Sequence, residues 1–202
     1  MKILNLYGGI GGYRYLWGND HKITMVDNNQ KICEIYEKLF PGDTVICGDA
    51  HEYLLAHADE FDFIWSSPPC QSHSKMMKGT RHKIRRYVDM TLYQEIIFLK
   101  HFFKGKWVVE NVKGYYEPLV KPQGLIDRHL FWGNISIPLI DLPKKKNFIK
   151  TSTKAGRHKI FEWLGIEPFD EIVYFEGSHD PCAFLRNCVH PLIGLKIMEE
   201  IK

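Results

Sequence analysis

A cysteine held between prolines and a glutamine is the residue of this chain best suited to nucleophilic chemistry. Cys70 belongs to the run PPCQ at 68–71, which follows the apolar segment FDFIW at 61–65 and two serines. That segment predicts a buried strand, and the prolines end it because they lack the amide proton that a central strand donates. Open α/β sheets place their ligands at the carboxyl ends of strands, so we expect Cys70 to face a substrate there.

A carboxyl group is the expected partner of this thiol. Residues 107–109 (WVV) predict a second buried strand that ends at Glu110, and Asn111 and Val112 follow it. A thiol and a carboxyl group at the ends of two strands predict a nucleophile and its acid.

Strands and helices alternate along most of the chain. We expect strands at 2–7, 22–26, 44–47, 61–65 and 107–109, a β-rich run at 128–137, and helices from Tyr13 onward and at 31–40, 52–58, 91–103, 159–164 and 192–201. This alternation predicts an α/β fold with a mixed, mostly parallel sheet flanked by helices. We divide the chain into a core at 1–134, a short irregular insertion at 135–157 and a segment at 158–202 that returns to the core.

Three successive strand ends carry residues suited to an adenosine group. The turn GGIGG at 8–12 lets the backbone pass close to a ligand. Asp27, at the end of the second strand, is where an acid meets ribose hydroxyls in nucleotide-binding folds. Asp49, after the third strand, could reach an adenine amino group, and Tyr7 could lie against the base.

The composition is typical of a globular chain in a reducing compartment. Of 202 residues, 45% are hydrophobic and 13% aromatic, and no apolar stretch approaches the roughly 20 residues of a membrane span. The chain starts without a signal-peptide pattern, and its five cysteines show no disulfide framework. We expect an intracellular protein, in the cytoplasm or nucleoid of a prokaryotic or viral system or in a nucleus.

The distribution of charge favours a polyanionic substrate more than its total does. The net charge is only +3 and the pI about 8.5. Basic residues nevertheless crowd the segment after Cys70, beside the candidate nucleophile, where they would contact phosphates. They are Lys75, Lys78, Arg81, Lys83, Arg85 and Arg86.

The ordered motifs resemble the cytosine-C5 DNA methyltransferases from the first strand almost to the last residue. Residues 5–13 (NLYGGIGGY), 68–71 (PPCQ) and 110–112 (ENV) look like the first, nucleophile and acid motifs of that family. Weaker similarities lie at 129–134 (HLFWGN), 162–166 (EWLGI) and 186–191 (RNCVHP). The resemblance implies a Rossmann-like methyltransferase fold and a compact member of the family.

The resemblance also implies a cofactor, S-adenosylmethionine, which the reaction turns into S-adenosylhomocysteine. Tyr7 would stack on adenine, Asp27 would hold the ribose and Asp49 would contact adenine. Tyr7 and Asn5 replace the phenylalanine and the acid that are common in the first motif. The residues implied to form the cofactor site are Tyr7, Gly9, Ile10, Gly11, Gly12, Asp27, Asn28, Asp49, Pro69, Leu92, Asn187 and Val189.

The implied acceptor is a cytosine in a polynucleotide, with double-stranded DNA as the expected partner. The Cys70 thiolate would add at C6 and make C5 nucleophilic enough to take a methyl group, while Glu110 would favour protonation of the ring. The target base would flip out of the duplex, with Gln71, Ser74 and the basic segment from Lys75 to Arg86 contacting the nucleic acid. The group that removes the C5 proton stays open.

Two departures from the family pattern concern substrate contacts. The family has two arginines, one residue apart, before its recognition region, and the second contacts the base; His129 takes that second place here, with Arg128 one position away. Either the histidine donates to the base or Arg128 reaches it. The region at 135–157 is also very short, so we expect a short recognition sequence or help from a second chain or a second copy.

Several alternatives remain at this point. The same catalytic residues could act on RNA, as one branch of the family does on transfer RNA, or the chain could be a non-catalytic regulatory subunit that binds DNA. The biological role could be restriction-modification, viral self-marking or regulation. His179, Cys182, Cys188 and His190 match no standard zinc spacing, so we expect no metal site.

Overall fold

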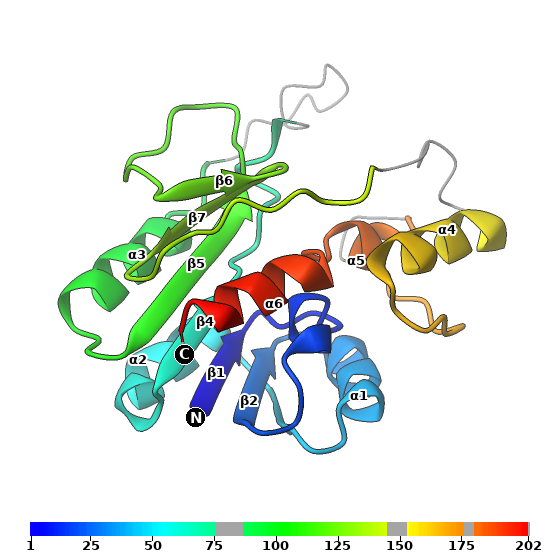
Figure 1. The fold of residues 1–202 in the computed structure, drawn as a ribbon, viewed down its shortest axis with the longest axis horizontal. Helices are drawn as coiled ribbons and strands as arrows, with labels where there is room; N and C mark the ends of the chain where they lie inside the picture. The colour runs from blue at the N-terminus through cyan, green and yellow to red at the C-terminus, as the bar shows by residue number, and fades with distance from the viewer. Residues whose placement is uncertain (76–86, 145–152, 176–179, 202) are drawn as a thin grey trace.

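A seven-stranded sheet of order β3-β2-β1-β4-β5-β7-β6 forms the centre of the molecule (Figure 1). The structure is a computed structural model that describes residues 1–75, 87–144, 153–175 and 180–201. Strands β1 to β5 run parallel, whereas β7 is antiparallel to β5 and β6 is antiparallel to β7. This confirms the mixed, mostly parallel sheet. The strands are β1 (Lys2–Leu6), β2 (Lys22–Asp27), β3 (Thr44–Cys47), β4 (Phe63–Ser66), β5 (Lys106–Val112), β6 (Gly124–Ile126) and β7 (His129–Gly133).

Helices cover both faces of this sheet, as the alternating pattern predicts. In Figure 1, α6 crosses in front of β1 and β4, while α2 and α3 lie behind the sheet. None of the helices in the described ranges has the length and apolar character that a membrane crossing requires. The helices are η1 (Tyr13–Leu16), α1 (Gln30–Leu39), α2 (Ala50–His57), η2 (Ala58–Glu60), α3 (Thr91–His101), α4 (Lys154–Leu164), α5 (Ala183–Arg186) and α6 (Pro191–Glu199).

Alternation of side chains along the strands gives each face of the sheet its own core. In β4, Ile64 packs into the core that includes α2 and α3, whereas Phe63 and Trp65 pack into the core that includes η1 and α6. In β7, Leu130 and Phe131 separate in the same way. Successive residues of a strand point to opposite faces, so burial on both faces holds the register of each strand.

Two short polar side chains determine where the helices after β2 and β3 begin. Asn29 Oδ1 accepts hydrogen bonds from the backbone of Lys31 and Ile32, at 3.1 and 3.2 Å, and caps α1. Asp49 Oδ1 caps α2 by accepting from His51 and Glu52, at 2.8 and 2.9 Å. These caps use backbone donors that a helix start leaves unpaired, so α1 begins three residues after the end of β2 at Asp27, and α2 begins three residues after the end of β3 at Cys47.

The structure corrects several predicted boundaries. The strand expected at 107–109 extends to Val112, because β7 pairs with its last five residues. The helix expected from Tyr13 onward is a single 3-10 turn, and Gly18 follows it with a φ of +77°, a conformation that suits glycine. Strand β6 and helix α5 are absent from the prediction.

Part of the predicted insertion at 135–157 belongs to the core. Ile135 is buried on the η1 and α6 side of the sheet, and Ile137, Ile140 and Leu142 pack against the same core. Helix α4 also crosses the predicted division between 157 and 158. The division into three segments stays a prediction.

A buried ion pair joins the first turn after the glycine-rich loop to the loop before β3. Arg14 donates two hydrogen bonds to the Asp43 carboxylate, at 2.9 and 3.0 Å, and both side chains are almost fully buried. The Tyr36 hydroxyl donates to the same carboxylate at 2.8 Å, and the guanidinium lies 4.9 Å from the centre of the Phe40 ring. Removing one partner of such a buried pair strongly destabilises the fold, because the other charge is left buried without compensation.

We predict that Asp43→Asn lowers the free energy of unfolding by about 3–5 kcal/mol, because it leaves the Arg14 charge buried without a counter-charge. Urea unfolding followed by circular dichroism measures this change. Lys196→Ala is the control, since it removes an exposed i,i+3 pair with Glu199 and should cost less than about 1 kcal/mol. Equal effects of the two substitutions would contradict the prediction.

Candidate active site

The segment that carries Cys70 is connected to β5 by a buried hydrogen bond. Cys70 lies just beyond β4, and the Asn111 amide donates to the Pro68 carbonyl at 2.9 Å. The Cys70 carbonyl accepts from the backbone of His73 and Ser74, at 3.1 and 3.0 Å, which turns the chain directly after the thiol. Strand β4 is hydrogen-bonded to β5 in parallel, so the thiol and the acid-bearing strand meet at one edge of the sheet.

Glu110 lies within β5 and is held by a neighbouring histidine. Its side chain is nearly buried, and its Oε1 lies 2.5 Å from His129 Nδ1 on β7. Oε2 has no hydrogen-bond partner in the described part of the chain. The carboxyl group therefore has one oxygen fixed by the protein and one available to a ligand.

Arg128 determines which nitrogen of His129 carries the proton. The Arg128 Nε–H lies 3.2 Å from His129 Nε2, and an arginine can only donate. Nε2 must then accept, so the imidazole is neutral and donates its Nδ1 proton to Glu110. Both ring nitrogens of His129 have protein partners, and the contact of His129 or Arg128 with the base stays a prediction. Arg128 itself is exposed, and its guanidinium also donates to the Arg186 carbonyl.

Burial and nearby charges act on the Cys70 thiol in opposite directions. Burial raises the pKa of Cys70 above its usual range, and the negative charge of Glu110 raises this pKa further. The positive charge of Arg128 lowers the pKa of the same thiol. A thiolate is the nucleophilic form, so Arg128 is the described residue whose charge favours reactivity.

The glycine-rich turn leaves space for a ligand beside the backbone. Gly9 has a φ of +53°, and no heavy atom lies within 4 Å of the position that its Cβ would take. Gly12 has the opposite surroundings, because a Cβ there would come within 2.7 Å of the Val189 carbonyl oxygen. Gly9 leaves space for a ligand, and Gly12 lets the segment that bears Cys188 and Val189 pack against the turn.

The acid at the end of β2 fits an adenosine group in this space. Asp27 accepts from the backbone of Gly9 and Asn29, at 3.1 and 3.0 Å, and is still partly exposed. A carboxylate has about four lone-pair positions, so Asp27 can also accept from ribose hydroxyls. Tyr7, with a φ of +54°, is partly exposed at the start of the same turn.

The other predicted site residues surround this edge or lie outside the described ranges. Ile10, Gly11, Leu92 and Val189 are buried. Leu92 packs in the core of α2 and α3, Val189 in the core of η1 and α6, and Ile10 in a third cluster with α1 and α4. Ser74 forms a β-bridge with Gly114. Exposed residues of the predicted sets are Asn28, Asp49, Pro69, Gln71, Lys75 and Asn187. Lys78, Arg81, Lys83, Arg85, Arg86 and His179 lie outside the described residues.

Sequence reasoning assigns no role to several residues that the structure places at the site. Asn111 follows the acid in its motif, and its connection to Pro68 is long-range in sequence. Ser66, His51 and Glu95 form a buried polar cluster with Tyr7. Glu95 lies within an otherwise apolar face of α3. An acidic residue on such a face is the sequence signal that could have identified Glu95.

We predict that two substitutions change the reactivity of Cys70 in opposite directions. Glu110→Gln should speed alkylation of Cys70 by iodoacetamide, because removing the negative charge lowers the thiol pKa; Arg128→Gln should slow alkylation. Peptide mass spectrometry measures the rate between about pH 7 and pH 10. Lys196→Ala, an exposed charge change on α6, should leave the rate unaltered. Identical rates in all the variants would contradict this account.

Comparison with known proteins identifies the family of the chain. The family model described as C-5 cytosine-specific DNA methylase matches residues 1–120. No curated protein sequence matches the chain.

One solved structure is similar in fold over the whole chain. The Entamoeba histolytica methyltransferase EhMeth has a TM-score of 0.60 and 13% identity, over 100% of this chain and 97% of that protein. DNMT2 from Spodoptera frugiperda has a TM-score of 0.41 and 26% identity, over 58% of this chain and 37% of its own. The Dnmt2 methyltransferase of S. pombe has a TM-score of 0.41 and 22% identity, over 59% of this chain and 36% of its own.

The predicted Rossmann-like methyltransferase fold is confirmed by the sheet and by the likeness to EhMeth. The family model covers more than half of the 202 residues and includes both Cys70 and Glu110. The chain therefore belongs to the C-5 cytosine-specific DNA methylase family and is a methyltransferase that uses S-adenosylmethionine.

Proposed function

We propose that this protein methylates C5 of cytosine in DNA through a covalent bond between Cys70 Sγ and C6 of the base. The observation that carries the proposal is the joining of the Cys70 segment to β5, which brings a thiol and a carboxyl group to one edge of the sheet. The DNA substrate is favoured by the family model, which describes DNA methylases and matches residues 1–120.

The first step makes cytosine C5 nucleophilic. The Cys70 thiolate adds to C6, and its electron pair forms the S–C6 bond while the ring π electrons move toward C5. Glu110 Oε2 is the oxygen available to hydrogen-bond N3 and the exocyclic amine, and a proton from this carboxyl group to N3 would neutralise the developing charge. His129 holds Oε1 meanwhile, so we assign it a positioning role and not a contact with the base.

S-adenosylmethionine, when bound, supplies an electrophilic methyl group to C5. The residues proposed to hold it are Tyr7 against adenine, Asp27 at the ribose and Gly9 at the open side of the turn. Loss of the C5 proton to a base then lets the electron pair return to C5–C6, and the Cys70–C6 bond breaks. The N3 proton returns to Glu110, and the thiolate and neutral 5-methylcytosine are released.

We propose that a second chain or a second copy helps to select the target sequence. Ile135, Ile137, Ile140 and Leu142 pack against the core, so these side chains of the short recognition segment cannot read the groove. Sequence readout needs contacts to base edges. Lys75, exposed after Cys70, is proposed to contact phosphate.

We predict that labelled methyl groups pass from S-adenosylmethionine to duplex DNA and not to transfer RNA. Bisulfite sequencing of DNA from cells that express the protein should show protected cytosines and reveal the recognition sequence. Cys70→Ala should remove protection, since no other described residue is placed to add to C6. Label found only in transfer RNA would replace DNA by RNA as the substrate, and label in neither acceptor would favour a non-catalytic role.

A further inference from the structure

A fully buried carboxyl group beside the proposed cofactor site has no part in the proposed reaction. Glu95 is on α3, with no exposed surface. Its neighbours on this helix, Leu92, Ile96 and Leu99, belong to the core between α2, α3 and the sheet. An acidic side chain is almost never fully buried unless it is paired, so its partners must account for its position.

Three side chains direct polar groups at this carboxylate. The Tyr7 hydroxyl donates to Glu95 Oε1 at 2.7 Å, and His51 Nδ1 lies 3.1 Å from the same oxygen. The Ser66 hydroxyl donates to Oε2 at 2.5 Å. An ionised carboxylate can accept all three hydrogen bonds at once, and no other described side chain offers these donors a common acceptor.

The three donors come from the segments that the proposed adenosine contacts occupy. Tyr7 is itself the proposed adenine-stacking residue at the end of β1. His51 follows Asp49 and is the second residue of α2. Ser66 ends β4, shortly before Pro69 and Cys70. On α3, Leu92 is also implied to form the cofactor site, and it lies one helical turn before Glu95.

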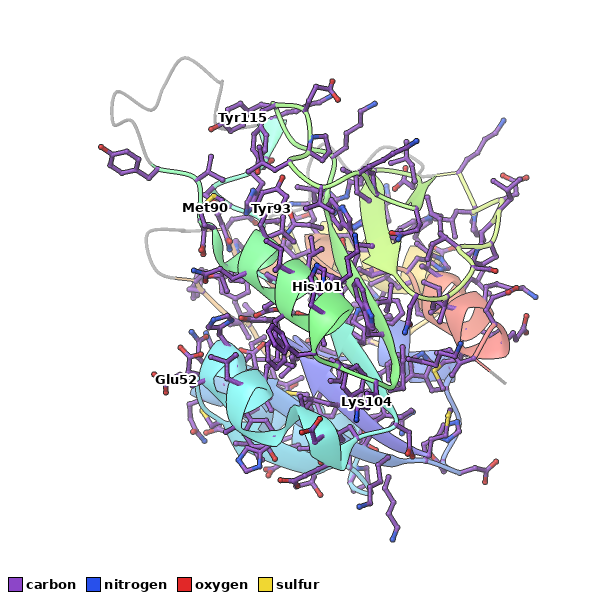
Figure 2. The ribbon with its side chains drawn as sticks, turned by 90° about the vertical axis from the view of Figure 1, so that its left-hand side faces the viewer. Glu52, Met90, Tyr93, His101, Lys104 and Tyr115 are labelled. Carbon is purple, nitrogen blue, oxygen red and sulfur yellow. The ribbon has the colours of Figure 1, made fainter. Side chains whose placement is uncertain are left out.

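The two helices concerned lie over the same face of the sheet and begin on the same side of it. Figure 2 shows the start of α2, near Glu52, and the start of α3, near Met90, on one side of the molecule, with His101 and Lys104 toward the other. Tyr93, also labelled there, is on the first turn of α3. Glu95 follows it by two residues, so the carboxylate connects the starts of both helices with the ends of β1 and β4.

The backbone of Tyr7 needs such a connection. Its φ of +54° is in the left-handed region, which costs a non-glycine residue free energy unless the surrounding structure holds it there. The backbone N–H donates to Val26 at 2.8 Å, and the side-chain hydroxyl donates to Glu95. These two hydrogen bonds hold the main chain and the ring of Tyr7 at opposite ends.

We infer that Glu95 is a positioning residue for the adenosine end of S-adenosylmethionine: it holds the Tyr7 ring and the start of α2 where the cofactor meets them. The inference rests on the proposed function, because it takes Tyr7 and Asp49 as cofactor contacts. Glu95 does not touch the cofactor or the reacting base. Its effect passes through the hydroxyl of Tyr7 and the imidazole of His51.

The test is direct binding of S-adenosylhomocysteine, measured by isothermal titration calorimetry, which needs no methyl acceptor. Tyr7→Phe keeps the aromatic face and removes only the hydroxyl, and Glu95→Gln keeps the side-chain shape. Each should raise Kd by about 10- to 150-fold, the usual weight of one lost hydrogen bond to a charged group. The KM for S-adenosylmethionine should rise likewise, with kcat changed less than about two-fold.

A double substitution separates positioning from general loss of stability. If Tyr7 acts through Glu95, Tyr7→Phe should add little to the Kd of Glu95→Gln. Tyr36→Phe is the matched control, because it removes another buried hydroxyl that donates to a carboxylate, that of Asp43, at 2.8 Å. Tyr36→Phe should lower the Tm and leave Kd unchanged.

Each outcome decides the inference. An unchanged Kd in Tyr7→Phe, with a wild type that binds the cofactor, overturns the positioning role and leaves the proposed function standing. Should Glu95→Gln fail to fold, Tyr7→Phe alone decides in the same way. A wild type that binds S-adenosylhomocysteine but methylates no DNA overturns the proposed substrate. The Kd values of the variants then still decide whether Glu95 is a positioning residue.

Discussion

The hydrogen bond from the Asn111 amide to the Pro68 carbonyl is the contact on which the candidate active site depends. At 2.9 Å and buried, it joins the loop that bears the thiol to the strand that bears the acid. Parallel pairing of β4 with β5 brings the two strand ends to one edge but does not determine the path of the chain after Ser66. Proline cannot donate at 68 or 69, so the two prolines contribute to hydrogen bonding only through their carbonyls, and the Pro68 carbonyl is the one that accepts from β5.

Three polar networks of the described structure share one principle. His129, between Glu110 and Arg128, leaves a single oxygen of Glu110 available to a ligand. Arg14, Asp43 and Tyr36 hold the turn after the glycine-rich loop, and Glu95 gathers donors from β1, β4 and α2. A charged group without its partners would be costly in each of these places, so the networks define one arrangement of the strand ends.

Local patterns were sufficient to predict the mostly parallel sheet and the places of Cys70 after β4 and Asp27 at the end of β2, because burial and turn residues act over short distances in sequence. The end of β5 was not predicted, since its extension to Val112 depends on pairing with β7. Partners that meet only in the folded chain could not be predicted in this way. His129 illustrates this limit: the sequence places it just before the recognition region, but only its contacts with Arg128 and Glu110 show that both of its ring nitrogens are used. Ile135, Ile137, Ile140 and Leu142 lie in the predicted insertion but pack against the core. This packing could not be predicted from local patterns, because the partners on η1 and α6 meet these residues only in the folded chain.

The central claim, that Cys70 adds covalently to the target base, is tested most directly by trapping with DNA that contains 5-fluorocytosine. Fluorine at C5 cannot leave as a proton does, so the Cys70–C6 bond should persist after methyl transfer. Incubation with S-adenosylmethionine followed by peptide mass spectrometry should find the methylated base attached to the peptide that contains Cys70, and no adduct in Cys70→Ala. An adduct on another cysteine, or C5 methylation of ordinary DNA by Cys70→Ala, would contradict the account.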